Sequence, residues 1–215
     1  MELCGLLGIP AFASPEYEAD DIIGTLAALM RAQGLRSTVV SRDKDLAQLV
    51  RAGDRMWDFG GAEPMAYEDV CLRFGVLPER FADYLALRGD AVDNVPGVPG
   101  VGPKTAAALM QEFETLEALY EALEPGPAGG RFERLGLRGA AGLRARLLEH
   151  RAAAWLARSL TRIACDVPLN VGRDHLRRGA PDAAGIEAFF DRHEFGPMLR
   201  RQAGRLAATL GSAAA

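Results

Sequence analysis

The spacing of hydrophobic and polar residues predicts a chain of amphipathic helices interrupted by two short strands. Apolar residues recur at helical intervals after Glu18 and stop at Gly34. Residues 35–41, LRSTVVS, form a β-branched run that leads into acidic residues and then into the amphipathic stretch DLAQLVRAG. This strand, turn and helix order is typical of a parallel sheet, and a second short strand is expected at residues 55–59. The pattern therefore predicts an α/β fold.

The rest of the chain reads as helices and loops. Further helices are expected at residues 67–74, 78–88, 103–113, 115–123, 140–162, 182–193 and 197–210. The stretch 125–130, PGPAGG, predicts a flexible joint, and residues 163–171 predict an extended segment. Residues 1–9 read as the tail of an apolar helix without a start signal of its own. We place a domain division between residues 88 and 89, with the strands before it and a helical domain at 89–215.

Residues 89–106, GDAVDNVPGVPGVGPKTA, combine a pair of carboxylates with a glycine-rich turn. Three glycines precede Pro103, which suits the first position of a helix. The free N–H groups and positive dipole end of a helix start, next to Lys104, favour a phosphate. The residues expected to contact it are Gly97, Gly100, Gly102, Lys104 and Thr105. The alternative interpretation is a plain Gly/Pro loop between two helices.

Seven carboxylates form three groups along the chain: Glu18, Asp20 and Asp21; Asp43 and Asp45; Asp90 and Asp93. The middle group follows a predicted strand, where parallel sheets place their active groups, although Asp45 could also simply cap a helix. If the three groups meet, their repulsion raises their pKa values unless cations are present. Oxygen ligands without His or Cys favour Mg²⁺ or Mn²⁺, and so many carboxylates suggest two ions roughly 3.5–4 Å apart, a geometry that serves phosphodiester hydrolysis.

Charge is distributed unevenly, and this changes how the net charge of −4 is interpreted. Residues 1–125 carry 10 basic and 21 acidic side chains, whereas residues 126–215 carry 15 basic and 8 acidic ones. An acidic part beside an arginine-rich part suggests a metal-collecting centre flanked by a surface that binds a nucleic-acid backbone, although arginines can also form a merely solvated face. Three cysteines without metal spacing indicate neither a disulfide framework nor a zinc site, and we expect a cytoplasmic protein without a membrane segment.

Three motifs together resemble those of the 5′-nuclease family, and in particular the 5′-3′ exonuclease domain of bacterial DNA polymerase I and its stand-alone relatives. They are YEADDIIGTLA at 17–27, VVSRDKDLAQLV at 39–50 and LRGDAVDNVPGVPGVGPKTA at 87–106, and the likeness continues to FFDRHEFGPMLR at 189–200. The resemblance implies a PIN-like (Rossmann-like) parallel sheet at residues 1–88, followed by a helix-hairpin-helix and further helices at 89–215. It also implies that the seven carboxylates are metal ligands or their outer-shell partners.

The same resemblance implies hydrolysis of DNA at a 5′ end, nick or flap in replication and repair, with two Mg²⁺ or Mn²⁺ ions and a K⁺ ion at the hairpin. A monomer is expected, and a DNA polymerase acting in trans is a candidate partner. In the family, these motifs follow an N-terminal portion with further strands, two more metal-binding aspartates and a helical arch, which this sequence does not show. We therefore expect the sheet to be incomplete on its N-terminal side and the chain alone to cleave DNA poorly.

Two other functions remain open at this point. A non-catalytic protein that binds branched DNA would keep the hairpin and the arginines but would leave DNA intact in Mg²⁺. A PIN-type ribonuclease would share acidic strand ends but needs no hairpin, so residues 97–104 disfavour it. Comparing flap DNA with single-stranded RNA as substrates would separate these functions.

Overall fold

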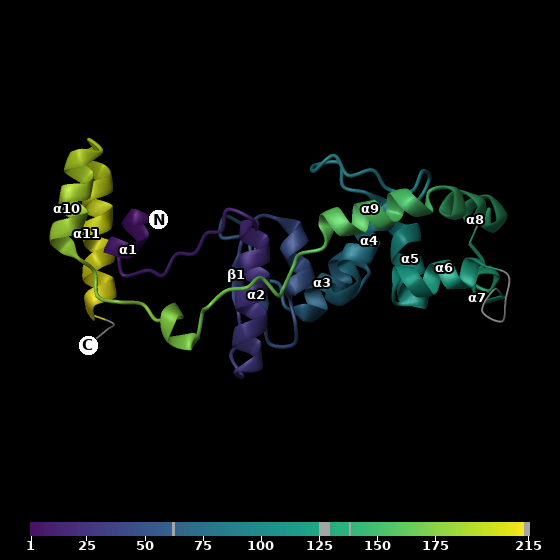
Figure 1. Ribbon diagram of the computed structural model, residues 1–215, viewed down its shortest axis with the longest axis horizontal. Coiled ribbons are helices and arrows are strands. Elements are labelled where there is room, and N and C mark those ends of the chain that lie inside the picture. The colour runs from purple at the N-terminus through teal and green to yellow at the C-terminus, as the bar shows by residue number, and fades with distance from the viewer. Residues whose placement is uncertain (62, 125–129, 138, 213–215) are drawn as a thin grey trace.

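The computed structural model describes residues 1–215 except 62, 125–129, 138 and 213–215, and it shows an elongated molecule (Figure 1). Its first half contains α1 (Glu2–Leu6), α2 (Ala19–Ala32), β1 (Thr38–Val40), the 3₁₀ helix η1 (Lys44–Leu49), β2 (Arg55–Trp57), α3 (Tyr67–Phe74), the 3₁₀ helix η2 (Pro78–Arg80) and α4 (Phe81–Arg88). Its second half contains α5 (Pro103–Phe113), α6 (Leu116–Leu123), α7 (Gly130–Glu133), α8 (Ala140–Glu149), α9 (Arg151–Thr161), the 3₁₀ helix η3 (Arg173–Leu176), α10 (Ala183–Arg192) and α11 (Pro197–Ser212).

The sheet is small, parallel and close to where the sequence predicts it. Strands β1 and β2 pair from Thr38 opposite Arg55 to Val40 opposite Trp57. The connection between them is the 3₁₀ helix η1 where an amphipathic helix was expected, and the Asp43 side chain caps it by accepting a hydrogen bond from the Asp45 N–H at 3.0 Å. Its apolar residues are buried, which holds the turn after β1 against the core. The α/β class is confirmed.

Helix α4 forms the centre of the hydrophobic core. Phe81, Leu85 and Leu87 are fully buried, and the helix packs against α9, α5 and η1. It ends at Gly89, whose φ is +80°, and a Cβ there would lie 2.4 Å from the Gly97 backbone nitrogen. Glycine is therefore required at this close approach, and α4 delivers Asp90 to a fixed position directly after its end.

The end of α9 and the residues that follow it, 161–167, are tied to α2 and η1 by side chains from the first half of the chain. The Gln48 side chain donates to the Thr161 carbonyl at 2.9 Å and accepts from the Ile163 N–H at 3.0 Å, and all of these atoms are buried. Asp21 accepts from the Ala164 N–H at 2.8 Å, and the Thr25 hydroxyl accepts from the Val167 N–H at 3.1 Å. Residues 162–172 form neither a helix nor a strand, and these contacts hold the end of α9 beside the start of α2.

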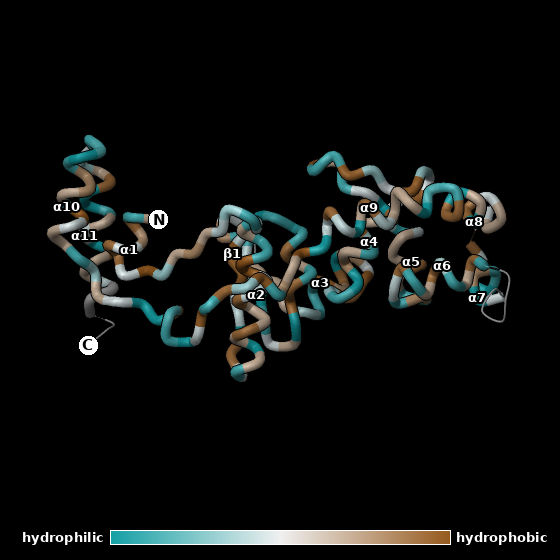
Figure 2. The backbone as a smooth tube through the Cα atoms, in the orientation of Figure 1, coloured by the Kyte–Doolittle hydropathy of each residue, from teal (hydrophilic) through white to brown (hydrophobic). Residues whose placement is uncertain are grey.

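The two ends of the chain meet in a separate small cluster at one end of the molecule (Figure 1). Leu7, next to α1, is buried with Ile186 and Phe190 of α10 and Ala203 of α11. Backbone hydrogen bonds from Asp182 to Leu6 and from Gly179 to Gly8, both 2.8 Å, tie α1 to the segment before α10. The chain around η3, which lies between α9 and α10, is mainly hydrophilic in Figure 2.

Further features differ from the sequence-based expectations or lie beyond comparison. The single helix predicted at 140–162 is two helices, because His150 adopts φ −98° and ψ 18° between α8 and α9. The break lets Leu143 and Leu147 of α8 and Ala154 and Ala157 of α9 all be buried. The flexible joint expected at 125–130 lies outside the described residues except for Gly130. The division at residue 88 stays a prediction.

Gln48→Ala should lower the free energy of unfolding by about 2–4 kcal/mol, because it leaves a buried carbonyl and a buried N–H without partners. Urea unfolding of the full chain would measure this loss. Gln33→Ala is the matched control, since the Gln33 side chain is exposed and makes only a 3.4 Å hydrogen bond within its own helix. Equal losses in the two variants would contradict a special role for Gln48.

Candidate metal centre and nucleic-acid interface

One cavity of about 530 Å³ gathers carboxylates from three separate segments of the chain. Its acidic lining residues are Glu16, Glu18, Asp20, Asp21, Asp43, Asp45 and Asp93. They come from the start of α2, the turn between β1 and η1, and the loop after α4, while residues 159–163 at the end of α9 close another side. Three acidic groups that are far apart in sequence therefore share one space.

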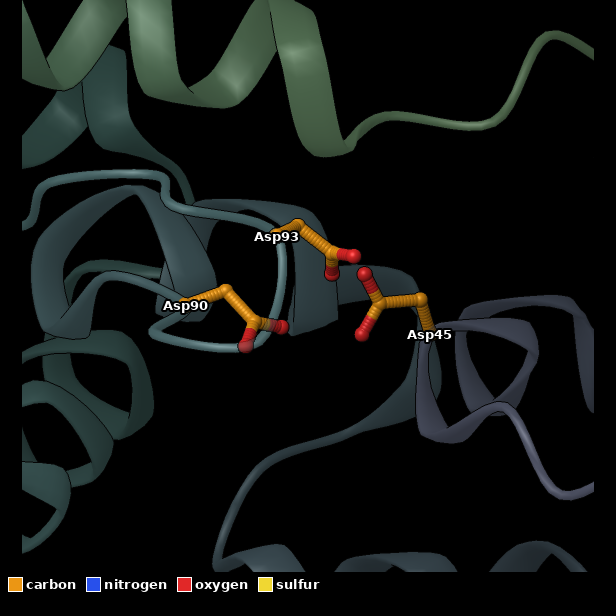
Figure 3. A group of neighbouring side chains, drawn as sticks. All are labelled: Asp45, Asp90 and Asp93. Atoms are coloured by element: carbon orange, nitrogen blue, oxygen red, sulfur yellow. The ribbon is translucent and has the colours of Figure 1, made fainter.

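Asp45, Asp90 and Asp93 form the tightest group in this region. One carboxylate oxygen of each lies within 4.8 Å of the others. Figure 3 shows Asp45 approaching from η1, opposite Asp90 and Asp93 on the loop after α4. Asp90 is buried, with 3% of its side chain exposed, and its Oδ1 accepts a hydrogen bond from the Val92 N–H at 3.1 Å. All seven predicted carboxylates therefore lie in or beside the cavity, and their role as ligands stays a prediction.

The carboxylates at the start of α2 differ in how many protein partners they have. Asp21 accepts hydrogen bonds from the Glu18 N–H at 3.2 Å and from the Ala164 N–H at 2.8 Å. Asp20 lines the cavity, and burial together with the negative charges of Asp43, Glu18, Asp21 and Asp93 raises its pKa. Asp21 thus holds the segment after α9 against α2, whereas Asp20 lines the cavity.

Asp45 shows the strongest electrostatic effect in the cavity. Burial, with the nearby charges of Asp90 and Asp43, raises its pKa to about 6, although the Lys44 ammonium opposes the shift. Its Oδ1 is buried and lies 3.3 Å from the Lys44 Nζ, although no hydrogen bond of good geometry reaches it. Buried polar atoms normally have hydrogen-bond partners, so a carboxylate oxygen without a well-formed hydrogen bond that faces other carboxylates suits a bound cation. With no His or Cys among the lining residues, the donor atoms fit a hard divalent ion.

The glycine-rich turn folds back onto the end of α4. Asp90 and Val95 exchange two backbone hydrogen bonds of 2.8 Å, and the Val98 N–H donates to the Leu87 carbonyl at 2.8 Å. Gly97 packs against the backbone of Arg88 and Gly89, so packing alone explains a glycine there. Gly100 has φ +76° and forms the turn before α5. The same short loop therefore carries both the aspartates and the turn.

The start of α5 is open to solvent. Gly102 is its N-cap, and a Cβ there would meet no atom within 4 Å, so packing does not require glycine at this position. Lys104 is exposed and Thr105 is half-buried in the first turn of α5, next to Pro103. The side chains near this helix start leave room for a ligand to approach the backbone, as the phosphate interpretation needs.

Arg146 of α8 lies against the same turn, a placement that sequence reasoning missed. Its Nε would be 3.2 Å from a Cβ on Gly100, and this Nε is buried without a hydrogen-bond partner. Within the described residues no carboxylate pairs with Arg146, whereas Arg144, Arg151 and Arg158 form ion pairs with Glu133, Glu124 and Glu117. The helical pattern placed all of these arginines on one helix and could not separate the paired ones from Arg146.

Two protein-family models match adjacent parts of the chain, and both describe 5′-3′ exonucleases. A model described as "5′-3′ exonuclease, N-terminal resolvase-like domain" matches residues 1–75, and one described as "5′-3′ exonuclease, C-terminal SAM fold" matches residues 76–184. The two matches meet 13 residues before the division predicted at residue 88.

Similar curated proteins are longer than this chain. A DNA polymerase I of Pseudomonas aeruginosa is 40% identical over 190 residues, which are 88% of this chain and 20% of that protein. A thermostable DNA polymerase I of Thermus aquaticus is 35% identical over 202 residues, 92% of this chain and 22% of that protein. A 5′-3′ exonuclease of Buchnera aphidicola is 34% identical over 170 residues, 79% of this chain and 57% of that protein.

Two solved structures share the fold at low sequence identity. The T5 5′-exonuclease with bound divalent zinc has a TM-score of 0.58 at 20% identity, covering 84% of this chain and 61% of that one. The catalytic core of Rad2 in complex with DNA substrate also has a TM-score of 0.58, at 17% identity, covering 97% of this chain and 67% of that one. Family models, sequence relatives and fold agree, and the chain belongs to the 5′-3′ exonuclease family.

Proposed function

We propose that this chain forms part of a metal-dependent phosphodiesterase that hydrolyses DNA at 5′ ends or flaps during replication and repair. The observation that carries the proposal is the cavity in which carboxylates from three distant segments meet. The exposed start of α5, on the loop that supplies two of them, would bind the substrate backbone. The relative named as a 5′-3′ exonuclease supports the reaction type, and the neighbour in complex with DNA substrate supports the nucleic acid.

Mg²⁺ or Mn²⁺ is the proposed cofactor of the cavity. Asp45, Asp90 and Asp93 would hold an ion, and Glu18, Asp20 and Asp43 would complete the ligands for two, with Asp21 as an outer partner. The close approach of the Asp45, Asp90 and Asp93 carboxylates, and the buried Oδ1 of Asp45 without a hydrogen bond of good geometry, support this fit. Bound ions would neutralise the carboxylates and stabilise the charge that develops on a phosphate under attack.

DNA is the proposed partner, bound through phosphates at the turn and the start of α5. Lys104 would supply a charge and the α5 N–H groups would supply donors, with Thr105 beside them and a K⁺ ion as a further candidate at the turn. Arg146, which pairs with no carboxylate among the described residues, adds a second cation against the same turn. We keep a monomeric state, a DNA polymerase acting in trans and a cytoplasmic location as parts of this proposal. Among the described residues, no helix is both long and apolar enough to cross a membrane.

Asp45→Asn combined with Asp93→Asn should lower cleavage of a 5′-flap DNA in Mg²⁺ by at least about 100-fold, because an ion would lose two charged ligands. Binding of the same DNA in Ca²⁺ should stay within about threefold of wild type. Asp58→Asn combined with Asp69→Asn removes the same charge outside the cavity lining and should leave cleavage unchanged.

Cleavage that survives the loss of Asp45 and Asp93 would remove the metal assignment. Binding without any cleavage by the wild-type chain would favour the non-catalytic alternative. Faster cleavage of single-stranded RNA than of flap DNA would favour a ribonuclease.

Lys104→Ala and Arg146→Ala should each weaken duplex binding. Each should also reduce the slope of log affinity against log salt by about 1, because one phosphate contact is lost. Fluorescence anisotropy at several salt concentrations would measure both effects. Arg36→Ala is the matched control, since Arg36 follows α2 at the end opposite the carboxylates. A slope unchanged in Lys104→Ala would argue against the phosphate site at α5.

Asp45→Asn should stabilise the protein in EDTA at pH 7. The pKa of Asp45 is about 6 in the folded chain, against its ordinary value of 3.8. Between about pH 4 and pH 6 the folded chain therefore keeps a proton that the unfolded chain has released, and the stability of the fold falls as the pH rises through this range. Removing this penalty should add about 1 kcal/mol, a value reduced for screening by solvent. Urea unfolding at pH 4.5 and pH 7 would measure it, and a variant less stable than wild type at pH 7 would contradict the assignment.

A further inference from the structure

Lys44 places an ammonium group among the carboxylates of the cavity. Its Nζ pairs with Oδ2 of Asp90 and lies 3.3 Å from Oδ1 of Asp45. These two aspartates belong to the group whose oxygens lie within 4.8 Å of one another. The structure therefore already holds one positive charge between two of the side chains proposed to bind a divalent ion.

We propose that Lys44 is a tethered counter-ion that holds Asp45 and Asp90 together while no divalent ion is bound, and that it must leave them when an ion binds. The inference rests on the proposed metal centre and adds to it the exchange of one cation for another. It concerns the state of the cavity before catalysis and the affinity with which the cavity takes up its ion.

The space between the Asp45 and Asp90 carboxylates favours replacement of the Lys44 ammonium by a divalent ion over the presence of both cations. An Mg²⁺ ion lies about 2.0–2.1 Å from its oxygen ligands, so an ion shared by Asp45 and Asp90 would occupy the region where the ammonium now lies. Two cations at that distance also repel each other in a partly buried site, where charges are poorly screened. An ion ligated by both aspartates therefore displaces the Lys44 head group.

The surroundings of Lys44 allow this movement without disturbing the ligands. Asp90 stays anchored through its other oxygen, which accepts from the Val92 N–H. The backbone at the start of η1 is held by the Asp43 cap, so only the flexible lysine side chain has to turn. Its side chain is 27% exposed against 3% for Asp90, and water is therefore within its reach.

The choice of lysine fits a counter-ion that has to be released. The chain has 25 basic residues, and all of them are arginine except Lys44 and Lys104. An ammonium is a strongly hydrated point charge on a flexible stem, whereas a guanidinium binds carboxylates through a planar fork that holds both oxygens. Lysine thus offsets the repulsion between Asp45 and Asp90, but its ammonium dissociates from the two carboxylates more easily than a guanidinium would.

The presence of only two lysines makes the movement directly measurable. In protein labelled with ¹³C-lysine, the ε-CH₂ groups should give two NMR signals, which Lys104→Met would assign. Titration with Mg²⁺ should move the Lys44 signal toward the position of the solvent-exposed Lys104 signal and leave that of Lys104 in place. A Lys44 signal that stays unchanged while the ion binds would overturn the inference.

Lys44→Met, which keeps the length of the side chain without its charge, should bind Mn²⁺ about tenfold more tightly than wild type, as measured by electron paramagnetic resonance or calorimetry. In EDTA it should unfold at lower temperature than wild type, and saturating Mg²⁺ should remove the difference. Lys104→Met removes the same charge from α5 and should match wild type in both measurements. Equal or weaker Mn²⁺ binding by Lys44→Met would show that Lys44 is a fixed part of the site.

The two proposals fail in different ways. If wild-type protein binds no Mn²⁺ at millimolar concentration, the metal centre itself is wrong and Lys44 is a permanent ion pair. If wild-type protein binds Mn²⁺ while the Lys44 signal does not move, the metal centre stands and only the exchange is wrong.

Discussion

Mutual repulsion among carboxylates is the constraint on which this structure depends, because the fold confines several of them in one partly buried cavity. Burial, together with the neighbouring negative charges, raises the pKa values of Asp45 and Asp20. Packing around α4 provides the opposing free energy: its buried residues fix the position of Asp90, and η1 fixes that of Asp45. The Lys44 ammonium offsets part of the repulsion, and a divalent ion would offset more.

The loop after α4 couples this cavity to the surface that would bind DNA. The contact between Gly89 and Gly97 and the hydrogen bonds between Asp90 and Val95 fold one short segment into a rigid unit. Asp90 and Asp93 lie at one end of it and the start of α5 lies at the other. A phosphate bound at α5 would therefore keep a constant position relative to the carboxylates, which is what cleavage at a defined place on a strand requires.

Local signals in the sequence were sufficient where an element depends on its own residues. Helix α3 ends before Gly75, which adopts the left-handed conformation, and α5 begins at Pro103. Both helices occupy the predicted ranges. The acidic groups could be recognised because one precedes a helix, one follows a strand and one leads into the glycine-rich turn. Their number exceeds what helix capping needs, and this excess indicates a shared site.

Contacts between distant segments could not be predicted in this way. The sequence by itself determined the α/β class, the ranges of most helices, the grouping of the carboxylates and the glycine-rich turn, because these follow from neighbouring residues and their periodicity. Only the tertiary structure decided the break at His150, the link from Gln48 to Thr161, the pairing of Lys44 with Asp90 and the position of Arg146 beside Gly100. Each of these features depends on how distant parts of the chain pack against one another. The local pattern of a single sequence does not show which distant residues will meet.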